Sequence, residues 1–192
     1  MSEEPVSYPL RMSNDSHREQ EMVWTSSDRV SFRVDREGAR RSTFIRDLLD
    51  QDKDSASAVN VEIGIGSHAL ERIAEYLNHF SRETPTKLRH EPIAKSPQEL
   101  LSPWEYHFVF SLLEEGEFEG NDLLQKVING ANYLNIEDLL DLCGFMVAWM
   151  IRDKTAEDIR QMFGVIGDLT TEEEQAIVEQ NKWCETEASK FE

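Results

Sequence analysis

The segment Gly64-Ile65-Gly66-Ser67-His68-Ala69 is the part of this chain most like a ligand-binding motif. It matches G-x-G-x-x-A between a predicted strand and a predicted helix, the arrangement that binds the pyrophosphate of a dinucleotide. That function requires the motif on the opening strand of a βαβ unit, followed by the further strands of a doubly wound sheet. The sequence supplies neither, so we interpret the glycines as a strand end and Ser67 as a helix cap.

The other reactive side chains form no catalytic or metal-binding pattern. The paired acids Glu114-Glu115 and Glu172-Glu173-Glu174 lie in polar runs where every carboxylate stays solvated and ionised, which argues against an acid–base pair. Cys143 and Cys184 stand apart, without a zinc or redox motif. The histidines are scattered with no i,i+4 pair, namely His17, His68, His79, His90 and His107. We therefore expect no catalytic residue, no cofactor, no metal and no enzymatic activity.

Charge and apolar content limit the class of partner and the compartment. The chain carries 38 acidic and 20 basic residues, a net charge of −18, and residues 114–192 hold 19 of the acids but only 6 of the bases. Such a surface disfavours nucleic acid and favours a protein with basic patches. The N-terminus has no apolar signal region, and no run of about 18 apolar residues spans a membrane. With only two cysteines, the protein is expected to be intracellular and reduced.

Periodicity predicts an α+β fold in which a small sheet precedes a helical C-terminal half. Residues 1–20 are polar and aperiodic and are expected to be a disordered arm. Val30, Phe32 and Val34 alternate with polar residues after a turn, which indicates a β-hairpin. The remaining prediction is a helix at 41–49, a strand at 59–65, a helix at 67–80, a proline-rich flexible insertion at 81–103, and helices at 104–113, 121–134, 136–152, 155–163 and 170 to about 184.

Helix 136–152 is apolar on two faces. One predicted stripe runs along Ile136, Leu139, Leu140, Cys143, Met146, Val147, Met150 and Ile151, and a second along Leu142, Phe145 and Trp149. Such a helix is either wholly buried or packs its own domain with one face and a partner with the other. The final helix has too few apolar residues to be held firmly, which makes its Trp183 a candidate anchor for a partner.

Sequence motifs in the C-terminal third resemble those of the S-phase kinase-associated protein family, the adaptors of SCF ubiquitin ligases. The resemblance is dense over residues 104–187 and weaker but in register over 22–80. The residues that carry it are Ala131-Asn132-Tyr133-Leu134-Asn135-Ile136, Leu139-Leu140-Asp141, Val147-Ala148, Met150-Ile151, Lys154-Thr155, Asp158-Ile159-Arg160, Glu172-Glu173-Glu174 and Asn181-Lys182-Trp183-Cys184-Glu185.

The resemblance implies a non-catalytic adaptor of the cytoplasm and nucleus. It implies a BTB/POZ-like domain with a small three-stranded sheet at residues 21–152, which docks on the N-terminal repeats of a cullin through Asn132 and Tyr133. It also implies helices at 153–192 that interlock with the F-box of a substrate receptor. The F-box-binding residues carried over by position are Leu140, Gly144, Val147, Ile151, Ile159, Phe163, Val165 and Trp183.

Three positions depart from the family pattern. Gly144 stands where the family usually has Cys, Gln125 where it has a bulky apolar residue, and Trp149 where a small polar residue is common. One alternative function stays open, a structural subunit that pairs with an F-box-like protein without a cullin, as in kinetochore or vacuolar-ATPase assembly. Self-association of the free chain, as in many BTB domains, also stays open.

Overall fold

The computed structural model describes residues 21–51, 60–88, 96–114, 122–165 and 169–182. The chain divides into two compact units, Met1–Asp153 and Lys154–Glu192. The expected disordered arm, residues 1–20, lies outside the described residues.

The first unit contains a three-stranded sheet with strand order β2-β1-β3. Strand β1 (Glu21–Thr25) pairs antiparallel with β2 (Ser31–Asp35), which confirms the predicted hairpin, and parallel with β3 (Asn60–Glu62). The register places Trp24 opposite both Phe32 and Val61. Because alternate side chains face the same side of a sheet, Met22 and Trp24 enter the core together with Val34 and Val61.

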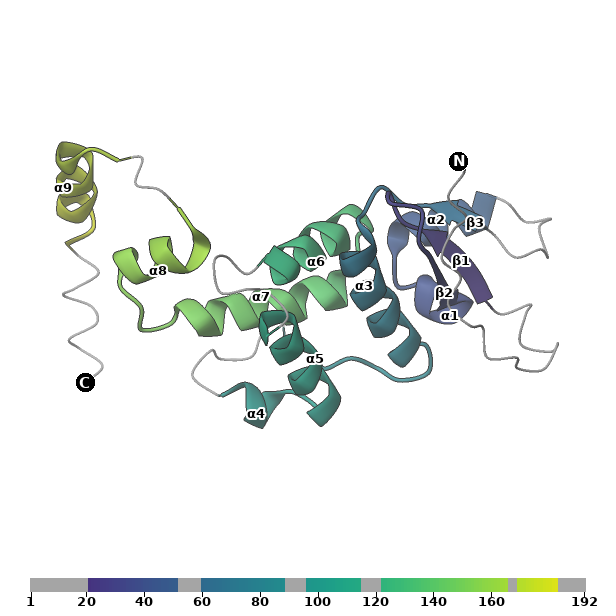
Figure 1. Ribbon diagram of the computed structural model, residues 1–192. Helices are drawn as coiled ribbons and strands as arrows, with labels where there is room; N and C mark the ends of the chain where they lie inside the picture. The colour runs from purple at the N-terminus through teal and green to yellow at the C-terminus, as the bar shows by residue number, and fades with distance from the viewer. Residues whose placement is uncertain (1–20, 52–59, 89–95, 115–121, 166–168, 183–192) are drawn as a thin grey trace. The chain divides into compact units, whose positions relative to one another are not determined.

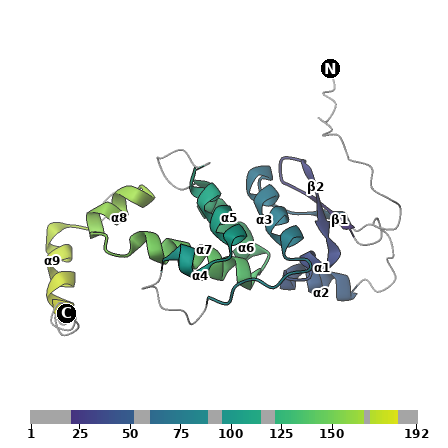
Figure 2. The same cartoon turned by 90° about the horizontal axis from the view of Figure 1, so that it is seen from below.

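Helices cover the apolar face of this sheet (Figures 1 and 2). Helix α3 packs against β2, α1 and α6, and α6 packs in turn against α5 and α7. The α+β class predicted from the sequence is confirmed. The helices of the first unit are α1 (Arg36–Ala39), α2 (Thr43–Gln51), α3 (Ser67–His79), α4 (Pro97–Leu100), α5 (Pro103–Glu114), α6 (Asp122–Tyr133) and α7 (Glu137–Ile151).

Two glycines allow other helices to approach α3 closely. A Cβ atom on Gly38 of α1 would lie 2.1 Å from the carbonyl oxygen of Leu77, a backbone atom that cannot move aside cheaply. A Cβ on Gly130 of α6 would lie 2.6 Å from the Cδ1 atom of Ile73. Gly38 therefore needs to be glycine, because an added methyl group would collide with backbone, whereas a methyl group at Gly130 would require the end of the Ile73 side chain to shift.

The structure contains two short helices, α1 and α4, that periodicity does not predict. Each has only four residues, too few for an apolar repeat. At the described ends of the segment 81–103, Pro85, Leu88 and Leu101 are buried. The sequence predicts a flexible insertion here, but these two ends pack on the core. A few apolar side chains between the prolines are enough to hold them there. The interior, residues 89–95, lies outside the described residues.

The second unit contains α8 (Ala156–Phe163) and α9 (Thr171–Gln180), neither of which has a buried residue. Both helices begin with a capping box, formed by Thr155 with Asp158 and by Thr170 with Glu173. The acidic run at 172–174 would also allow a capping box between Thr171 and Glu174, but the structure forms the one between Thr170 and Glu173. Glu174 instead forms an ion pair with Arg160, which links the two helices.

Glu105 fastens the segment after α3 to the start of α5. Its side chain is only 1% exposed, and its carboxylate accepts hydrogen bonds from the Thr86 backbone N–H at 2.8 Å, the Thr86 hydroxyl at 2.5 Å and the Ser102 N–H at 2.9 Å. Burial alone raises the pKa of Glu105, but the hydrogen bonds from Thr86 and Ser102 outweigh it and hold the pKa below its ordinary value. The buried carboxylate is therefore ionised and fully hydrogen-bonded at neutral pH.

We predict that Glu105→Gln lowers the free energy of unfolding at pH 7 by about 1–3 kcal/mol. The NH₂ group of the glutamine would face the N–H and hydroxyl donors of Thr86 and Ser102 and would be buried without an acceptor. A group whose pKa is lowered by folding stabilises the fold above its unfolded pKa and loses that contribution as the pH falls through the folded value. Urea unfolding from pH 7 down to pH 3 should show the difference between wild type and variant narrowing in acid.

Glu99→Gln is the matched control. Glu99 accepts a hydrogen bond from the N–H of Ser96, three residues before it, at 3.3 Å, as Glu105 does from Ser102, but Glu99 is exposed. Its effect should be about 0.5 kcal/mol or less. Equal losses in the two variants would contradict the role given to burial at Glu105.

Candidate partner-binding surfaces

Asn132 and Tyr133, the residues expected to face a cullin, lie at the C-terminal end of α6. Both side chains are exposed, and Tyr133 is 54% exposed. Their neighbours Ala131 and Leu134 are fully buried. The helical repeat thus turns one pair of residues into the core and the other pair toward solvent. The structure brings Asn132 and Tyr133 together on one exposed surface.

A hydrogen-bonded clasp joins this end of α6 to the start of α2. The buried Ser42 hydroxyl donates to the carbonyl oxygen of Leu134 at 2.5 Å and accepts from the N–H of Ile45 at 3.1 Å. The Thr43 N–H donates to the carbonyl oxygen of Asn135 at 3.3 Å, and the Asn135 side-chain amide donates to the Thr43 hydroxyl. Asn135 has a φ of 51°, in the left-handed region that asparagine tolerates better than most residues.

The clasp places Phe44 beside Tyr133, with ring centroids 5.8 Å apart and planes tilted by 41°. Phe44 is 41% exposed, although it shares helical spacing with the buried residues Ile45 and Leu49 and the half-buried Leu48. Sequence reasoning missed this residue as a surface candidate. The pattern held no signal for it, because an apolar residue at helical spacing predicts burial.

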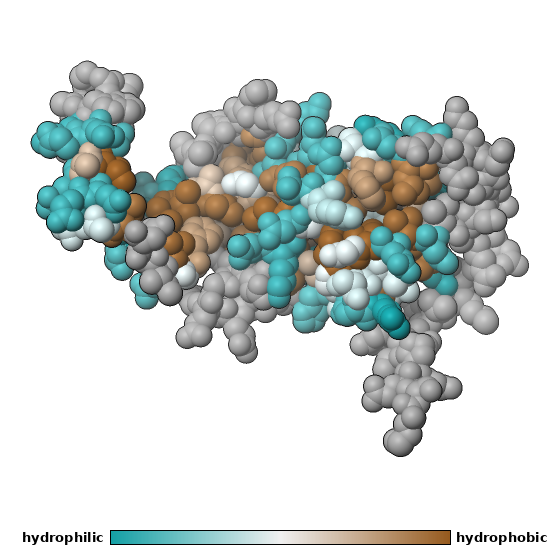
Figure 3. All heavy atoms as spheres, turned by 90° about the horizontal axis from the view of Figure 1, so that it is seen from above, coloured by the Kyte–Doolittle hydropathy of each residue, from teal (hydrophilic) through white to brown (hydrophobic). Residues whose placement is uncertain are grey.

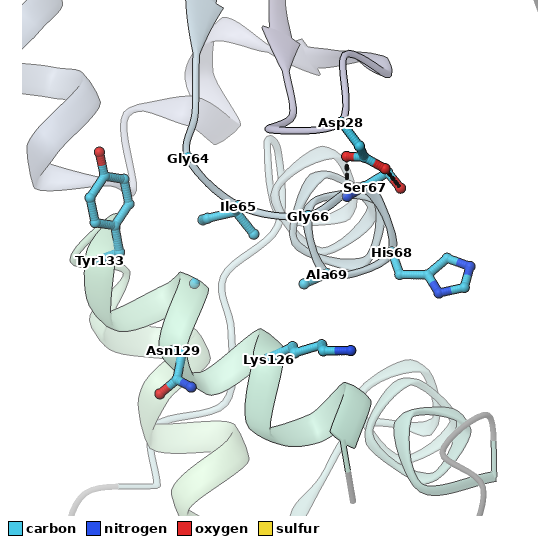
Figure 4. Close-up of a pocket in the computed structure, with 11 residues that line it drawn as sticks. Asp28, Gly64, Ile65, Gly66, Ser67, His68, Ala69, Lys126, Asn129 and Tyr133 are labelled. Atoms are coloured by element: carbon cyan, nitrogen blue, oxygen red, sulfur yellow. Dashed lines mark hydrogen bonds between the residues drawn. The ribbon is translucent and has the colours of Figure 1, made fainter. Parts of the chain in front are cut away.

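A pocket of about 450 Å³ opens next to Tyr133, between the turn at Gly64–Gly66 and one face of α6 (Figure 4). Lys126, Asn129 and Tyr133 of α6 line one side, and Ile65 belongs to the turn that lines the other. The glycine-containing segment singled out in the sequence thus forms part of this pocket wall.

The N-terminus of α3, at the pocket's edge, is already occupied by a carboxylate of the chain itself. Asp28 accepts hydrogen bonds from the Ser67 backbone N–H, at 2.8 Å, and from the Ser67 hydroxyl (Figure 4). The Ser67 hydroxyl bond, with a further one from Ser26, lowers the pKa of Asp28 to about 2. A pyrophosphate would meet a negative charge at the place where a dinucleotide fold offers free N–H groups. This geometry supports the interpretation of the motif as the turn between a strand and a helix, but the prediction that Ser67 caps the helix is wrong. Ser67 is the first residue of α3, the N-cap position falls on Gly66, and the Asp28 carboxylate accepts the Ser67 N–H in place of a local cap.

Helix α7 carries the first group of residues predicted to bind an F-box. Leu140, Gly144, Val147 and Ile151 follow one another at spacings of four, three and four, so they share one face. Gly144 is exposed and the other three are half-buried. The two predicted stripes are not the two observed faces, because the buried face combines Leu139, Cys143 and Met146 from one with Leu142 and Phe145 from the other. A helix that packs against both α5 and α6 buries a wider arc than one stripe.

The last turn and a half of α7 is apolar all round. Residues 147–151 are consecutive, none is charged, and every side chain is half-buried. Hydrophobic side chains gather over this end of the helix in the space-filling view (Figure 3). The ring of Trp149 packs edge-on against Phe110 at 6.4 Å, and its buried Nε1 has no hydrogen-bond partner. This end exposes more apolar surface than the rest of the helix.

The second unit presents its own apolar residues. Ile159 is half-buried, and Phe163 and Val165 are exposed at the end of α8. Leu169, Ile177 and Val178 are exposed as well. Gly164 ends α8 in the left-handed conformation, with a φ of 63°. Trp183, the remaining predicted F-box residue, lies outside the described residues.

Two kinds of side chain bear on catalysis, the thiol of Cys143 and the groups that could bind a metal. Cys143 is fully buried, and burial raises the pKa of its thiol to about 12, so the thiolate nucleophile is suppressed at neutral pH. Across the described ranges, no group of three or more His, Cys, Asp or Glu side chains could hold a metal ion. Within the same ranges no helix is both long and apolar enough to cross a membrane.

The small mixed sheet, the covering helices and the helical extension define a BTB/POZ-like domain followed by C-terminal helices. Two family patterns match the chain: the tetramerisation domain of the Skp1 family, a POZ domain, over residues 20–82, and the dimerisation domain of the same family over residues 137–184.

Known proteins match over most of their own length. A protein named S-phase kinase-associated protein 1 homolog from Tetrahymena thermophila is 31% identical over 157 residues, which cover 81% of this chain and 89% of the relative. SKP1-like protein 18 from Arabidopsis thaliana is 33% identical, covering 84% and 94%. The E3 ubiquitin ligase complex SCF subunit sconC from Arthroderma otae is 30% identical, covering 84% and 92%. The chain belongs to the S-phase kinase-associated protein (Skp1) family.

Gly144, where the family usually has Cys, leads to a test. A Cβ atom there would meet nothing within 4 Å, so Gly144→Ala removes the conformational freedom of a mid-helix glycine without a clash. We predict that it raises the free energy of unfolding by about 0.5–1 kcal/mol. The contrasting variant Gly38→Ala should lower it by about 1–3 kcal/mol, because the new methyl group collides with the backbone of Leu77. Urea unfolding curves measure both, and a destabilised Gly144→Ala would show that the space above Gly144 is not open.

Proposed function

We propose that this protein is the non-catalytic adaptor subunit of an SCF-type cullin–RING ubiquitin ligase. In this role residues 21–152 form the BTB/POZ-like part that binds the N-terminal region of a cullin, and residues 153–192, together with α7, bind the F-box of substrate receptors. The protein would act in the cytoplasm and nucleus, in ubiquitin-dependent degradation.

The observation that carries the proposal is the extent of the match to named SCF subunits. The sconC relative, whose name states that it is a subunit of an SCF ubiquitin ligase, aligns with 84% of this chain and 92% of its own length. Both halves of the chain match domains of the same family. An alignment that includes both the POZ part and the helical extension favours a protein that works through both.

The proposed cullin-binding surface consists of Asn132 and Tyr133. Their exposure, next to a pocket and above buried neighbours, suits a rigid contact site. Aromatic side chains held in place by a core lose little conformational entropy when a partner covers them. We therefore assign the energetic centre of this surface to Tyr133.

The proposed F-box-binding surface uses apolar residues of both units. Leu140, Gly144, Val147 and Ile151 come from α7, and Ile159, Phe163, Val165 and Trp183 come from the second unit. A helix pair without buried residues, such as α8 and α9, gains little from its own packing. A receptor that covers these side chains would complete a core that the adaptor alone leaves open, which is the role we propose for the F-box.

Separate surfaces predict separable losses of binding. Asn132→Lys combined with Tyr133→Lys should weaken binding of an N-terminal cullin fragment and leave F-box binding unchanged, because the changes lie on exposed side chains of α6. Phe163→Ala combined with Trp183→Ala should do the reverse. Loss of an aromatic anchor at an interface costs about 2 kcal/mol or more, so each Kd should rise at least about thirtyfold. Titration calorimetry with both purified partners measures the two constants.

Two results would count against the proposal. If both variants bound both partners as the wild type does, the residues assigned to the surfaces would be wrong. If the wild type bound F-box proteins but no cullin, the protein would be a structural subunit of another complex.

A further inference from the structure

Two large hydrophobic side chains are exposed among the described residues of the first unit, and they touch each other. They are Phe44, 41% exposed, and Tyr133, 54% exposed, with ring centroids 5.8 Å apart. A single exposed aromatic residue is ordinary on a protein surface and needs no explanation. Two in contact form a patch, and this patch joins the first turn of α2 to the end of α6.

The patch is held in place by bonds outside the two rings. The Ser42 hydroxyl connects the first turn of α2 to the Leu134 carbonyl at the end of α6, and the Thr43 N–H bonds to the Asn135 carbonyl. The residues flanking the rings, Ile45 and Leu134, are fully buried. The backbone positions of Phe44 and Tyr133 are therefore fixed relative to each other. A surface fixed before binding costs little entropy to cover.

We propose that Phe44 is a further contact residue for the cullin-type scaffold, so that the scaffold-binding surface extends from α6 onto the first turn of α2. This inference rests on the proposed function, in which Asn132 and Tyr133 face the scaffold. A partner that covers the Tyr133 ring meets the Phe44 ring in the same contact, because the two rings share one exposed surface. The segment of the scaffold that lies here presents an apolar or aromatic side chain across both rings.

Continuity with the proposed scaffold surface favours the scaffold over a second copy of this chain as the occupant. Tyr133 belongs both to the aromatic pair and to the wall of the pocket at Gly64–Gly66. The pair is thus continuous with the proposed scaffold surface on α6. A hydrophobic centre of two rings beside the polar Asn132 also has the composition of a small interface core with a polar rim.

The test compares binding of the full chain to an N-terminal cullin fragment. Phe44→Ala should raise the Kd at least about tenfold and leave the affinity for an F-box protein unchanged. Arg46→Ala is the matched control, because Arg46 is an exposed residue two positions along α2, on the opposite side of the helix. It should leave both affinities unchanged. Thermal unfolding of Phe44→Ala verifies that the variant stays folded.

A double-mutant cycle with Tyr133→Ala tests whether the two rings act as one contact. Because the rings touch, the combined loss of scaffold affinity should be smaller than the product of the separate losses. Independent losses would show that Phe44 acts elsewhere and would overturn the shared contact.

The possible failures are distinguishable. If Tyr133→Ala loses scaffold binding and Phe44→Ala does not, the inference is wrong and the proposed function stands. If Phe44→Ala keeps scaffold affinity but abolishes self-association in sedimentation, the pair belongs to a contact between copies of the chain, which also overturns the inference. If the wild type does not bind the cullin fragment, both the inference and the cullin part of the proposed function fail.

Discussion

The close packing around α3 is the constraint on which the first unit depends. This helix buries Leu70, Ile73 and Leu77 and contacts the sheet on one side and α1 and α6 on others. Two of these contacts are close because Gly38 and Gly130 have no side chain. A larger residue at Gly38 would displace the backbone of a neighbouring element, and one at Gly130 would displace the Ile73 side chain. Protein interiors are packed as densely as organic crystals, so such displacements are transmitted to the surface. The location of α6, and with it the end that carries Tyr133, follows from this packing.

Hydrogen bonds from buried polar side chains, rather than glycine contacts, fix the positions of α2 and α5. The Ser42 hydroxyl and its neighbours connect α2 to α6, and Glu105 joins the segment after α3 to α5. In each case a buried polar side chain bonds to the backbone of a segment distant in sequence. Such a bond costs little when satisfied and much when one partner is removed, so it specifies one arrangement of the elements. The positions of the exposed residues on those elements are fixed as a result.

Most elements of the first unit could be predicted from the sequence, because the period-2 and period-3.6 patterns indicate which segments form strands and helices with an apolar face. The hairpin at Trp24 and Phe32 and the helices that became α3, α5, α6 and α7 follow from such patterns. Helix α1 could not be predicted, since a single turn has no period. Nor could the exposure of Phe44, because spacing gives a helical face and not the neighbour that covers it. The family resemblance, not periodicity, singled out Asn132 and Tyr133.

A partner that covers the apolar end of α7 would stabilise the folded chain. Residues 147–151 keep their side chains half-exposed in the free chain. A ligand that binds only the folded form stabilises it by mass action, by about 2.7 kcal/mol at a hundred times its Kd. A cell that makes this chain in excess of its partners would therefore hold a population that unfolds more often and is degraded sooner. The amount of this protein would then follow the amount of its partner.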